Sequence, residues 1–192
     1  MARDLTQLEL LSELQPVAEE NLNRHLSMAK EWHPHDYVPW DEGRNFAALG
    51  GEDWSPEQSQ LDEVAKAAMI TNLLTEDNLP SYHREIAENF SQDGAWGTWV
   101  GRWTAEENRH GIVMRDYLVV TRGVDPVALE NARMEHMTNG FASPAGEEGE
   151  QMGFLHSVAY VTFQELATRV SHRNTGKVCN HPIADRMLQR IA

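Results

Sequence analysis

The chain has 192 residues, a length typical of one domain. Hydrophobic residues make up 41% and charged residues 24%, so the chain can bury a core and is not disordered as a whole. Lys and Arg number 16 against 30 Asp and Glu, a formal charge of -14, which argues against a protein whose whole surface binds nucleic acid. The single cysteine, Cys179, excludes a disulfide framework and a multi-cysteine zinc site, and it indicates a reducing, cytoplasmic location.

The N-terminal segment 1–54 is predicted to be rich in loops. Its first 22 residues contain acidic residues throughout and no continuous apolar stretch, so they do not look like a secretory signal. Pro16, followed by Glu19 and Glu20, predicts the start of a helix over 16–30. The stretch 31–54 is rich in Trp, Pro and Gly, and it contains too many helix breakers for a regular element.

From residue 55 onward, apolar residues recur at helical spacing. Ser55-Pro56 predicts a helix start, and Pro80 predicts its end or a kink near Leu79. Further helices are expected over 95–120, 126–139, 151–172 and 182–192, with a polar loop at 143–150 and a helix stop at 174–176. No alternating strand pattern and no apolar run long enough to span a membrane is present. The fold class is therefore all-α, one helical domain over 1–192 whose bundle helices lie in 55–192.

Three carboxylates share a helix face with apolar residues, although charged residues of a bundle normally face water. Glu107 and His110 lie three positions apart on one such stripe, so both side chains can reach one point. Glu76 and Glu165 lie on comparable stripes of two other helices. A buried, unpaired carboxylate costs on the order of several kcal/mol. The set therefore predicts a shared cation, with iron or manganese favoured over copper or structural zinc.

Each of these residues also has an ordinary structural interpretation. A single Glu-x-x-His is common on helices. Glu165 and Arg169 have the spacing of a surface ion pair, and Glu76, close to Pro80, could lie at a solvated helix end. Taken singly, none of these residues indicates a metal site. The occurrence of all of them in one helical chain favours metal binding over the structural interpretations.

Four longer motifs carry a resemblance to a known family. They are WHPHDYVPW (32–40), TEDNLPSYHRE (75–85), WTAEENRHG (103–111) and FQELATRVSHRNTG (163–176). In this order, and along nearly the whole chain, the sequence resembles the soluble acyl-[acyl-carrier-protein] desaturases, most closely their actinobacterial, mycobacterial-type branch. The resemblance implies a ferritin-like helical bundle that holds two irons.

The resemblance also implies roles for individual residues. Glu76, Glu107, His110 and Glu165 would be iron ligands, and Thr168, one turn beyond Glu165, would lie near the oxygen-binding side. Trp32 would lie on the electron path toward the ligand histidine, although it could equally be a loop aromatic that packs on the bundle.

The implied reaction is the insertion of a cis double bond into a saturated acyl chain during fatty acid biosynthesis, with O2 as oxidant. The implied partners are acyl carrier protein, a ferredoxin-type electron donor and a second copy of the chain. Acyl carrier proteins are acidic, so a basic patch is needed; Arg169, Arg173 and Lys177 are candidates, or else solvated charges near a helix end.

One expected part of the family pattern does not occur in these residues. A second Glu-x-x-His should follow the segment KVCNHPIADRMLQRIA (177–192), whereas Glu107 to His110 is the only such pair. Only four of the six ligands are therefore present, and we expect a truncated form, a bundle incomplete at its C-terminus with its last helix or helices missing. A partial site should bind iron substoichiometrically.

Two other functions fit the same residues. A ferritin-like di-iron oxidase or iron-binding protein would have the ligands without a narrow, bent apolar tunnel beside Glu107 and Glu165. A non-catalytic family member, acting as a binding or dimerisation module, would form no double bond in any acyl chain.

Overall fold

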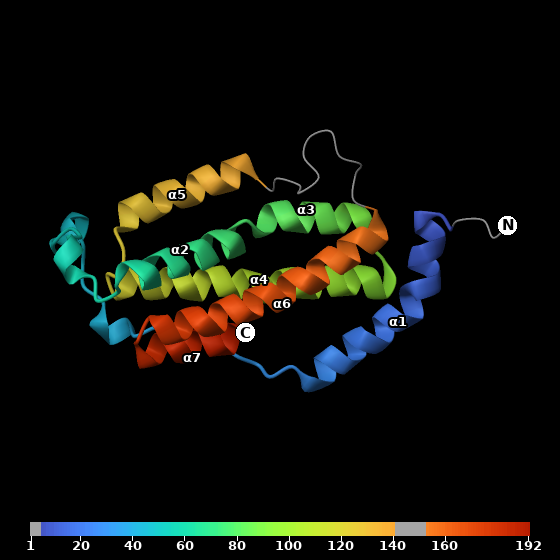
Figure 1. Ribbon diagram of the computed structural model, residues 1–192, viewed down its shortest axis with the longest axis horizontal. Coiled ribbons are helices and arrows are strands. Elements are labelled where there is room, and N and C mark those ends of the chain that lie inside the picture. Colours follow the sequence, from blue (N-terminus) through green and yellow to red (C-terminus); the bar gives the residue numbers. More distant parts are fainter. Residues whose placement is uncertain (1–4, 141–152) are drawn as a thin grey trace.

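The computed structural model describes residues 5–140 and 153–192 and contains no strand within them (Figure 1). The predicted all-α class is therefore confirmed, while the polar loop expected at 143–150 lies outside the described residues. Short 3-10 helices occupy parts of 34–58. The seven helices are α1 (Gln7–Met28), α2 (Glu63–Asp77), α3 (Leu79–Asn89), α4 (Gly94–Val120), α5 (Pro126–Asn139), α6 (Phe154–Val178) and α7 (Pro182–Ile191).

Helix α4 is the centre of the arrangement. It contacts α1, α2, α3 and α7, and α6 packs on α2, α3 and α7 (Figure 1). Two apolar clusters result: one includes Met69, Met114 and Leu188, and the other includes Ile86 and Phe154. Because these clusters lie toward opposite ends of α4, the middle of α4 is where polar side chains can meet inside the bundle. No helix of the described residues is long and apolar enough to cross a membrane.

Two helices begin at different residues from those predicted. Helix α1 begins at Gln7, because Thr6 and Glu9 form a reciprocal capping box, and it continues through Pro16. Ser55-Pro56 begins only the 3-10 helix Pro56–Gln58. Helix α2 instead begins at Glu63, where the Asp62 side chain accepts a hydrogen bond from the amide of Ala65. In both cases a cap with a satisfied amide outweighs the proline signal.

Pro80 separates α2 from α3. Helix α2 ends at Asp77, as the proline predicts, but a second helix, absent from our prediction, starts at Leu79 with Pro80 in its first turn. This break leaves Glu76 in the last turn of α2.

Helix α6 is longer than predicted. It continues past the expected stop at 174–176 and ends at Val178. Gly176 therefore lies inside the helix and does not end it. A Cβ atom at this position would be 3.0 Å from Asp185 Oδ1 and 3.1 Å from Asp185 Cα, so the lack of a side chain at Gly176 lets α7 approach α6 closely. The extension keeps His172 within a regular helix, two turns beyond Glu165.

One face of α6 carries apolar side chains that are exposed to solvent. Phe163 is 71% exposed, Leu166 58% and Val170 52%. An apolar strip of this kind is what a bundle helix shows when one of its faces has no helical neighbour.

Arg122 joins the loop of residues 44–58 to the end of α4. Its side chain is buried, and Nη1 donates to Gln58 Oε1 at 2.9 Å. Nη2 donates to the carbonyls of Asn45 and Glu52 at 3.0 and 2.9 Å, and the guanidinium lies 4.2 Å from the centre of the Phe46 ring. Its two terminal nitrogens thus donate to neutral acceptors and its plane lies on an aromatic face, while Nε has no hydrogen-bond partner among the described residues.

Replacing Arg122 with methionine should lower the free energy of unfolding by about 3 kcal/mol, because the hydrogen bonds from this buried side chain to Gln58, Asn45 and Glu52 are lost together. Urea unfolding followed by circular dichroism measures the change. Arg122→Lys, which keeps the charge but not the fork of donors, should lose a large part of the same stability. Wild-type stability in the methionine variant would contradict this role.

A candidate metal centre in the middle of the bundle

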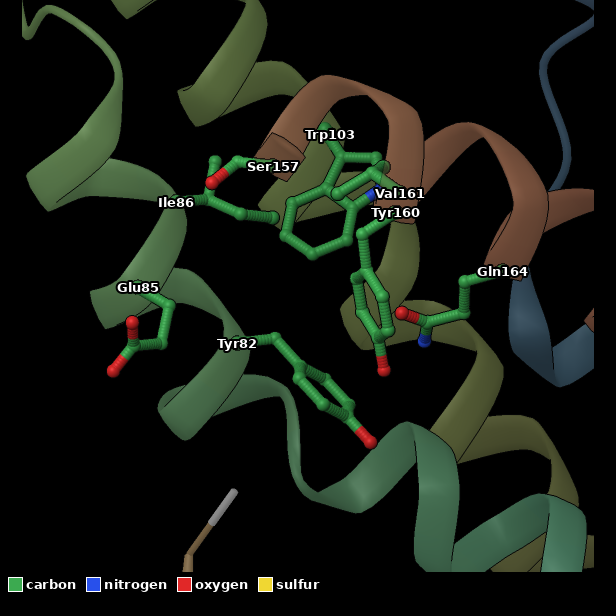
Figure 2. Close-up of a pocket in the computed structure, with 8 residues that line it drawn as sticks. All are labelled: Tyr82, Glu85, Ile86, Trp103, Ser157, Tyr160, Val161 and Gln164. Carbon is green, nitrogen blue, oxygen red and sulfur yellow. The ribbon is translucent and has the colours of Figure 1, made fainter. Parts of the chain in front are cut away.

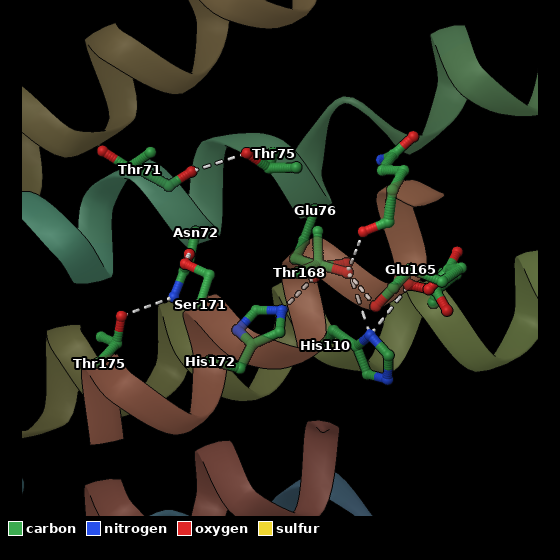
Figure 3. Close-up of polar contacts among 12 residues, drawn as sticks. Thr71, Asn72, Thr75, Glu76, His110, Glu165, Thr168, Ser171, His172 and Thr175 are labelled. Carbon is green, nitrogen blue, oxygen red and sulfur yellow. Dashed lines mark hydrogen bonds and ion pairs between the residues drawn. The ribbon is translucent and has the colours of Figure 1, made fainter. Parts of the chain in front are cut away.

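Glu76 from α2 and Glu107 and His110 from α4 meet inside the bundle. In the described part of the chain they form the one group of three His, Cys, Asp or Glu residues whose possible ligand atoms all lie within 4.8 Å of one another. His110 Nδ1 is 3.4 Å from Glu76 Oε2 (Figure 3). The same nitrogen is 3.0 Å from Glu107 Oε2. Their side chains are between 8% and 17% exposed. The predicted convergence of these three residues is found, and a solvated position for Glu76 is wrong.

A glycine allows the two helices to bring these side chains together. A Cβ atom on Gly111 would be 2.9 Å from Asp77 Oδ1, a distance that real Cβ contacts do not show. Gly111 therefore permits the last turn of α2 to lie against α4 where Glu76 faces Glu107. On α4 itself, Val100 and Met114 are buried on either side of the pair and hold this stripe inward.

The electrostatics of the cluster are those of charges held close together and away from water. Burial alone would raise the pKa of Glu76, but the imidazoles of His110 and His172 outweigh it and lower that pKa to about 2. Burial would lower the pKa of His110, but Glu107 and Glu76 raise it to about 10. Without a metal, His110 is therefore an imidazolium that neutralises neighbouring carboxylates.

Glu165 lies at the edge of the same space. A cavity of about 210 Å³ is lined by Glu76, Glu107, His110, Glu165 and Thr168, among others. In the described residues Glu165 has no ion pair with Arg169; its Oε1 accepts a hydrogen bond from Trp103 Nε1 at 3.1 Å. Burial, followed by repulsion from Glu107, raises the pKa of Glu165 to about 7. The simple surface-pair interpretation of Glu165 is therefore wrong.

Thr168 also faces this cavity. Its hydroxyl donates to backbone carbonyls of its own helix, those of Gln164 at 3.1 Å and Glu165 at 3.2 Å. Because neither bond involves another helix, the hydroxyl can rotate toward the cavity without loss of tertiary contacts.

Trp32 is buried against His110. Its ring stacks on His110, with centroids 6.1 Å apart and an interplanar angle of 18°. The guanidinium of Arg109 lies 4.9 Å from the ring centre and that of Arg190 5.8 Å. These residues and Lys30 line a cleft of about 700 Å³ that reaches His110 from the surface.

Two residues beside the cluster, Trp103 and His172, have no role in the prediction from sequence. Trp103, four positions before Glu107 on α4, is the donor to Glu165. His172 was taken for the end of a helix, whereas its Nε2 lies 2.8 Å from Glu76 Oε1 (Figure 3). The available signal was the spacing of Glu165, Thr168 and His172, three and then four positions, which places all three on one helix face.

The donor set fits an oxygen-preferring transition metal. Carboxylate oxygens and one imidazole nitrogen suit iron or manganese. His110 Nδ1 is buried and, despite its short distances to two carboxylates, has no hydrogen bond of good geometry among the described residues. Ligand atoms that lie within 4.8 Å of one another, one of them without a hydrogen bond, are close enough to share one metal ion.

Comparison with known proteins identifies the family. A sequence profile of the family described as fatty acid desaturase matches residues 6–192. The chain belongs to the fatty acid desaturase family. This desaturase-family chain is similar to DesA1 of Mycobacterium tuberculosis, named as an acyl-[acyl-carrier-protein] desaturase, with 61% identity over all of this chain and 57% of the relative.

Two less similar relatives are also named as acyl-[acyl-carrier-protein] desaturases, and this chain again covers only part of their length. The chloroplastic stearoyl-[acyl-carrier-protein] 9-desaturase of Spinacia oleracea is 30% identical over 89% of this chain and 43% of its own length. The X-ray structure of DesA2 from Mycobacterium tuberculosis superposes with a TM-score of 0.67 at 37% identity, over 95% of this chain and 62% of DesA2. The ferritin-like helical fold is thereby confirmed. The chain spans about 57% of the length of DesA1.

Proposed function

We propose that this chain is part of an acyl-[acyl-carrier-protein] desaturase, which inserts a cis double bond into a saturated acyl chain in fatty acid biosynthesis. The observation that carries the proposal is the buried convergence of Glu76, Glu107 and His110 in a member of the desaturase family. The names of the relatives DesA1 and the spinach enzyme support the substrate class.

Glu76, Glu107, His110 and Glu165 would hold iron. Two bound irons would supply the power to oxidise an unactivated methylene with O2, which no side chain can do. The chain's own task is to orient the ligands. Trp103 donates to Glu165, so this carboxylate is aligned before any metal is bound. Thr168 would donate a hydrogen bond on the oxygen-binding side of the cavity that it shares with Glu165.

Two small adjoining cavities support an acyl substrate over simple iron storage. One lies beside Glu107, Glu165 and Thr168. The other has mainly apolar walls that include Ile86 and Val161, and both are lined by Tyr82, Trp103 and Gln164 (Figure 2). Each cavity has a volume of about 20 Å³, room for about one water molecule, so a methylene chain would pass the carboxylates and end between α3 and α6 only after the lining side chains move apart. A channel opened along this line would hold one part of the chain beside the carboxylates and so would select the carbons that react.

Electrons would enter through the cleft that contains Trp32. The tryptophan is in stacking contact with His110. The charged residues that line the cleft are the cations Lys30, Arg102, Arg109 and Arg190 and the acids Glu31, Glu106 and Glu107, so positive charge is in slight excess. In a chain of net charge -14, this local charge suits an acidic reductant of the ferredoxin type.

The acyl carrier protein would use a different surface. Arg169, Arg173 and Lys177 are exposed and follow one another at four-residue spacing along α6, which aligns them on one side of the helix. A basic row of this kind suits an acidic partner. We further propose that the protein is a homodimer in the cytoplasm.

A desaturation assay tests the proposal. The protein, at the full length that its gene encodes, is loaded with iron and incubated with O2, a ferredoxin reducing system and acyl carrier protein bearing saturated chains of different length. Mass spectrometry of the released fatty acids should detect one cis double bond at a fixed position. Bound iron without any double bond would instead favour an iron-handling protein, and the absence of both would favour a binding module.

A further inference from the structure

We propose that His172 is a positioning residue that holds the Glu76 carboxylate in its orientation toward the metal. The inference rests on the proposed di-iron function, since it assigns a role at that site. His172 lies on α6, whereas Glu76 lies on α2, so the contact joins two helices that each contribute to the cavity.

The geometry gives the two oxygens of Glu76 different partners. Oε1 lies 2.8 Å from His172 Nε2, and Oε2 faces His110 Nδ1 at 3.4 Å (Figure 3). A carboxylate with one oxygen held by a donor cannot rotate freely about its last bond. The other oxygen is therefore kept on the side where Glu107 and His110 present their own ligand atoms.

The proton of His172 must lie on the nitrogen that faces Glu76. The residue is only 3% exposed, and its Nδ1 has no hydrogen-bond partner among the described residues. If the ring carried its proton only on Nδ1, two lone pairs would oppose each other at Nε2 and Glu76 Oε1. The Nε2–H form removes that repulsion and makes His172 a donor.

A row of buried polar side chains fixes the position of His172 along α6. Ser171 Oγ donates to Asn72 Oδ1 at 2.7 Å, and Asn72 Nδ2 donates to Thr175 Oγ1 at 3.0 Å (Figure 3). Asn72 and Thr175 are both buried. Because this row pairs α2 with α6 one turn from Glu76, a slip of either helix would break it. His172 is thus presented to Glu76 in a fixed register.

Cobalt(II) binding to this chain tests the inference without an activity assay. The dissociation constant and the visible d–d absorption spectrum are measured for wild type, His172→Phe, His172→Gln and His172→Asn. The phenylalanine variant keeps a ring but no donor, and it should bind Co²⁺ about 10- to 100-fold more weakly with an altered spectrum. The glutamine amide can reach the position of Nε2 and should restore binding to within about 3-fold.

The asparagine variant keeps the experiment decisive if the phenylalanine variant does not fold. Gln and Asn carry the same amide, but the Asn amide is one methylene too short to reach Glu76. Binding by His172→Asn should therefore be as weak as expected for His172→Phe. Thr175→Val is the matched structural control, because it breaks the bond to Asn72 and leaves Glu76 untouched. It should lower the melting temperature and leave the Co²⁺ dissociation constant within about 3-fold.

Two results would overturn the inference alone. Wild-type affinity and spectrum in His172→Asn, or a loss in Thr175→Val as large as in His172→Asn, would show that His172 does not position the ligand. No Co²⁺ binding by the wild-type chain would overturn the proposed metal site itself, and the inference with it.

Discussion

Replacing Glu107 with glutamine should weaken the binding of Mn²⁺ or Fe²⁺ about 100-fold, whereas the same replacement at the adjacent Glu106 should leave it unchanged. Glu107 supplies a ligand atom within 4.8 Å of those of Glu76 and His110. An amide of the same shape lacks the negative charge that a hard cation requires. It also removes one of the two carboxylates next to the His110 ring.

Glu106 provides the matched control because the substitution, the helix and the neighbourhood in sequence are the same. Its carboxylate faces away from the cluster, 2.9 Å from His25 Nε2 on α1 and paired with Arg102. Losing these partly exposed pairs should cost less than about 1 kcal/mol. Mn²⁺ titration followed by electron paramagnetic resonance measures both variants. Equal affinities for Glu107→Gln and Glu106→Gln would remove Glu107 from the metal centre.

Metal affinity should rise by about a thousandfold between pH 6 and pH 8.5, because the metal must displace protons from its ligands. The pKa of His110 is raised to about 10, so binding at neutral pH releases one proton from this ring. The pKa of Glu165 is raised to about 7, so binding below that pH releases close to a second. The logarithm of the affinity should therefore have a slope near one above pH 7 and approach two below it.

The same Mn²⁺ titration, repeated at a series of pH values, checks this slope. Glu165→Gln should lower the slope below pH 7 to about one while leaving it unchanged near pH 8. A pH-independent affinity in the wild-type chain would mean that the metal does not replace the proton of His110.

The stability of the metal-free chain should change in the opposite direction. The folded-state pKa of His110 lies above its ordinary value of 6.5, so its stabilising contribution is full below that pH and is lost as the pH rises toward 10. The raised pKa of Glu165 has the same sign, with a loss between about pH 4.5 and 7. Metal binding should therefore protect the fold most in alkaline buffer, which thermal melts with and without Mn²⁺ measure.

Local pattern was sufficient for much of the fold. The Asp125-Pro126 start and the Gly140 stop of α5 were predicted at the residues where they occur, because both signals act within one turn. The inward face of α4 was also predictable from spacing alone. Helix α3 and the beginnings of α1 and α2 were missed, because prolines were taken as helix boundaries, whereas the caps at Thr6 and Asp62 set the starts of α1 and α2, and α3 accommodates Pro80 in its first turn.

The sequence by itself determined which carboxylates face inward and that Glu107 and His110 act together, because helical spacing places residues three or four apart on one face whatever surrounds them. Only the tertiary structure decided which residues from other helices meet them. The pairing of Glu76 with His172, separated by 96 positions, and that of Trp103 with Glu165, separated by 62, depend on how α2, α4 and α6 pack. Packing is set by contacts such as Gly111 on Asp77 and Gly176 on Asp185, which no single helix contains.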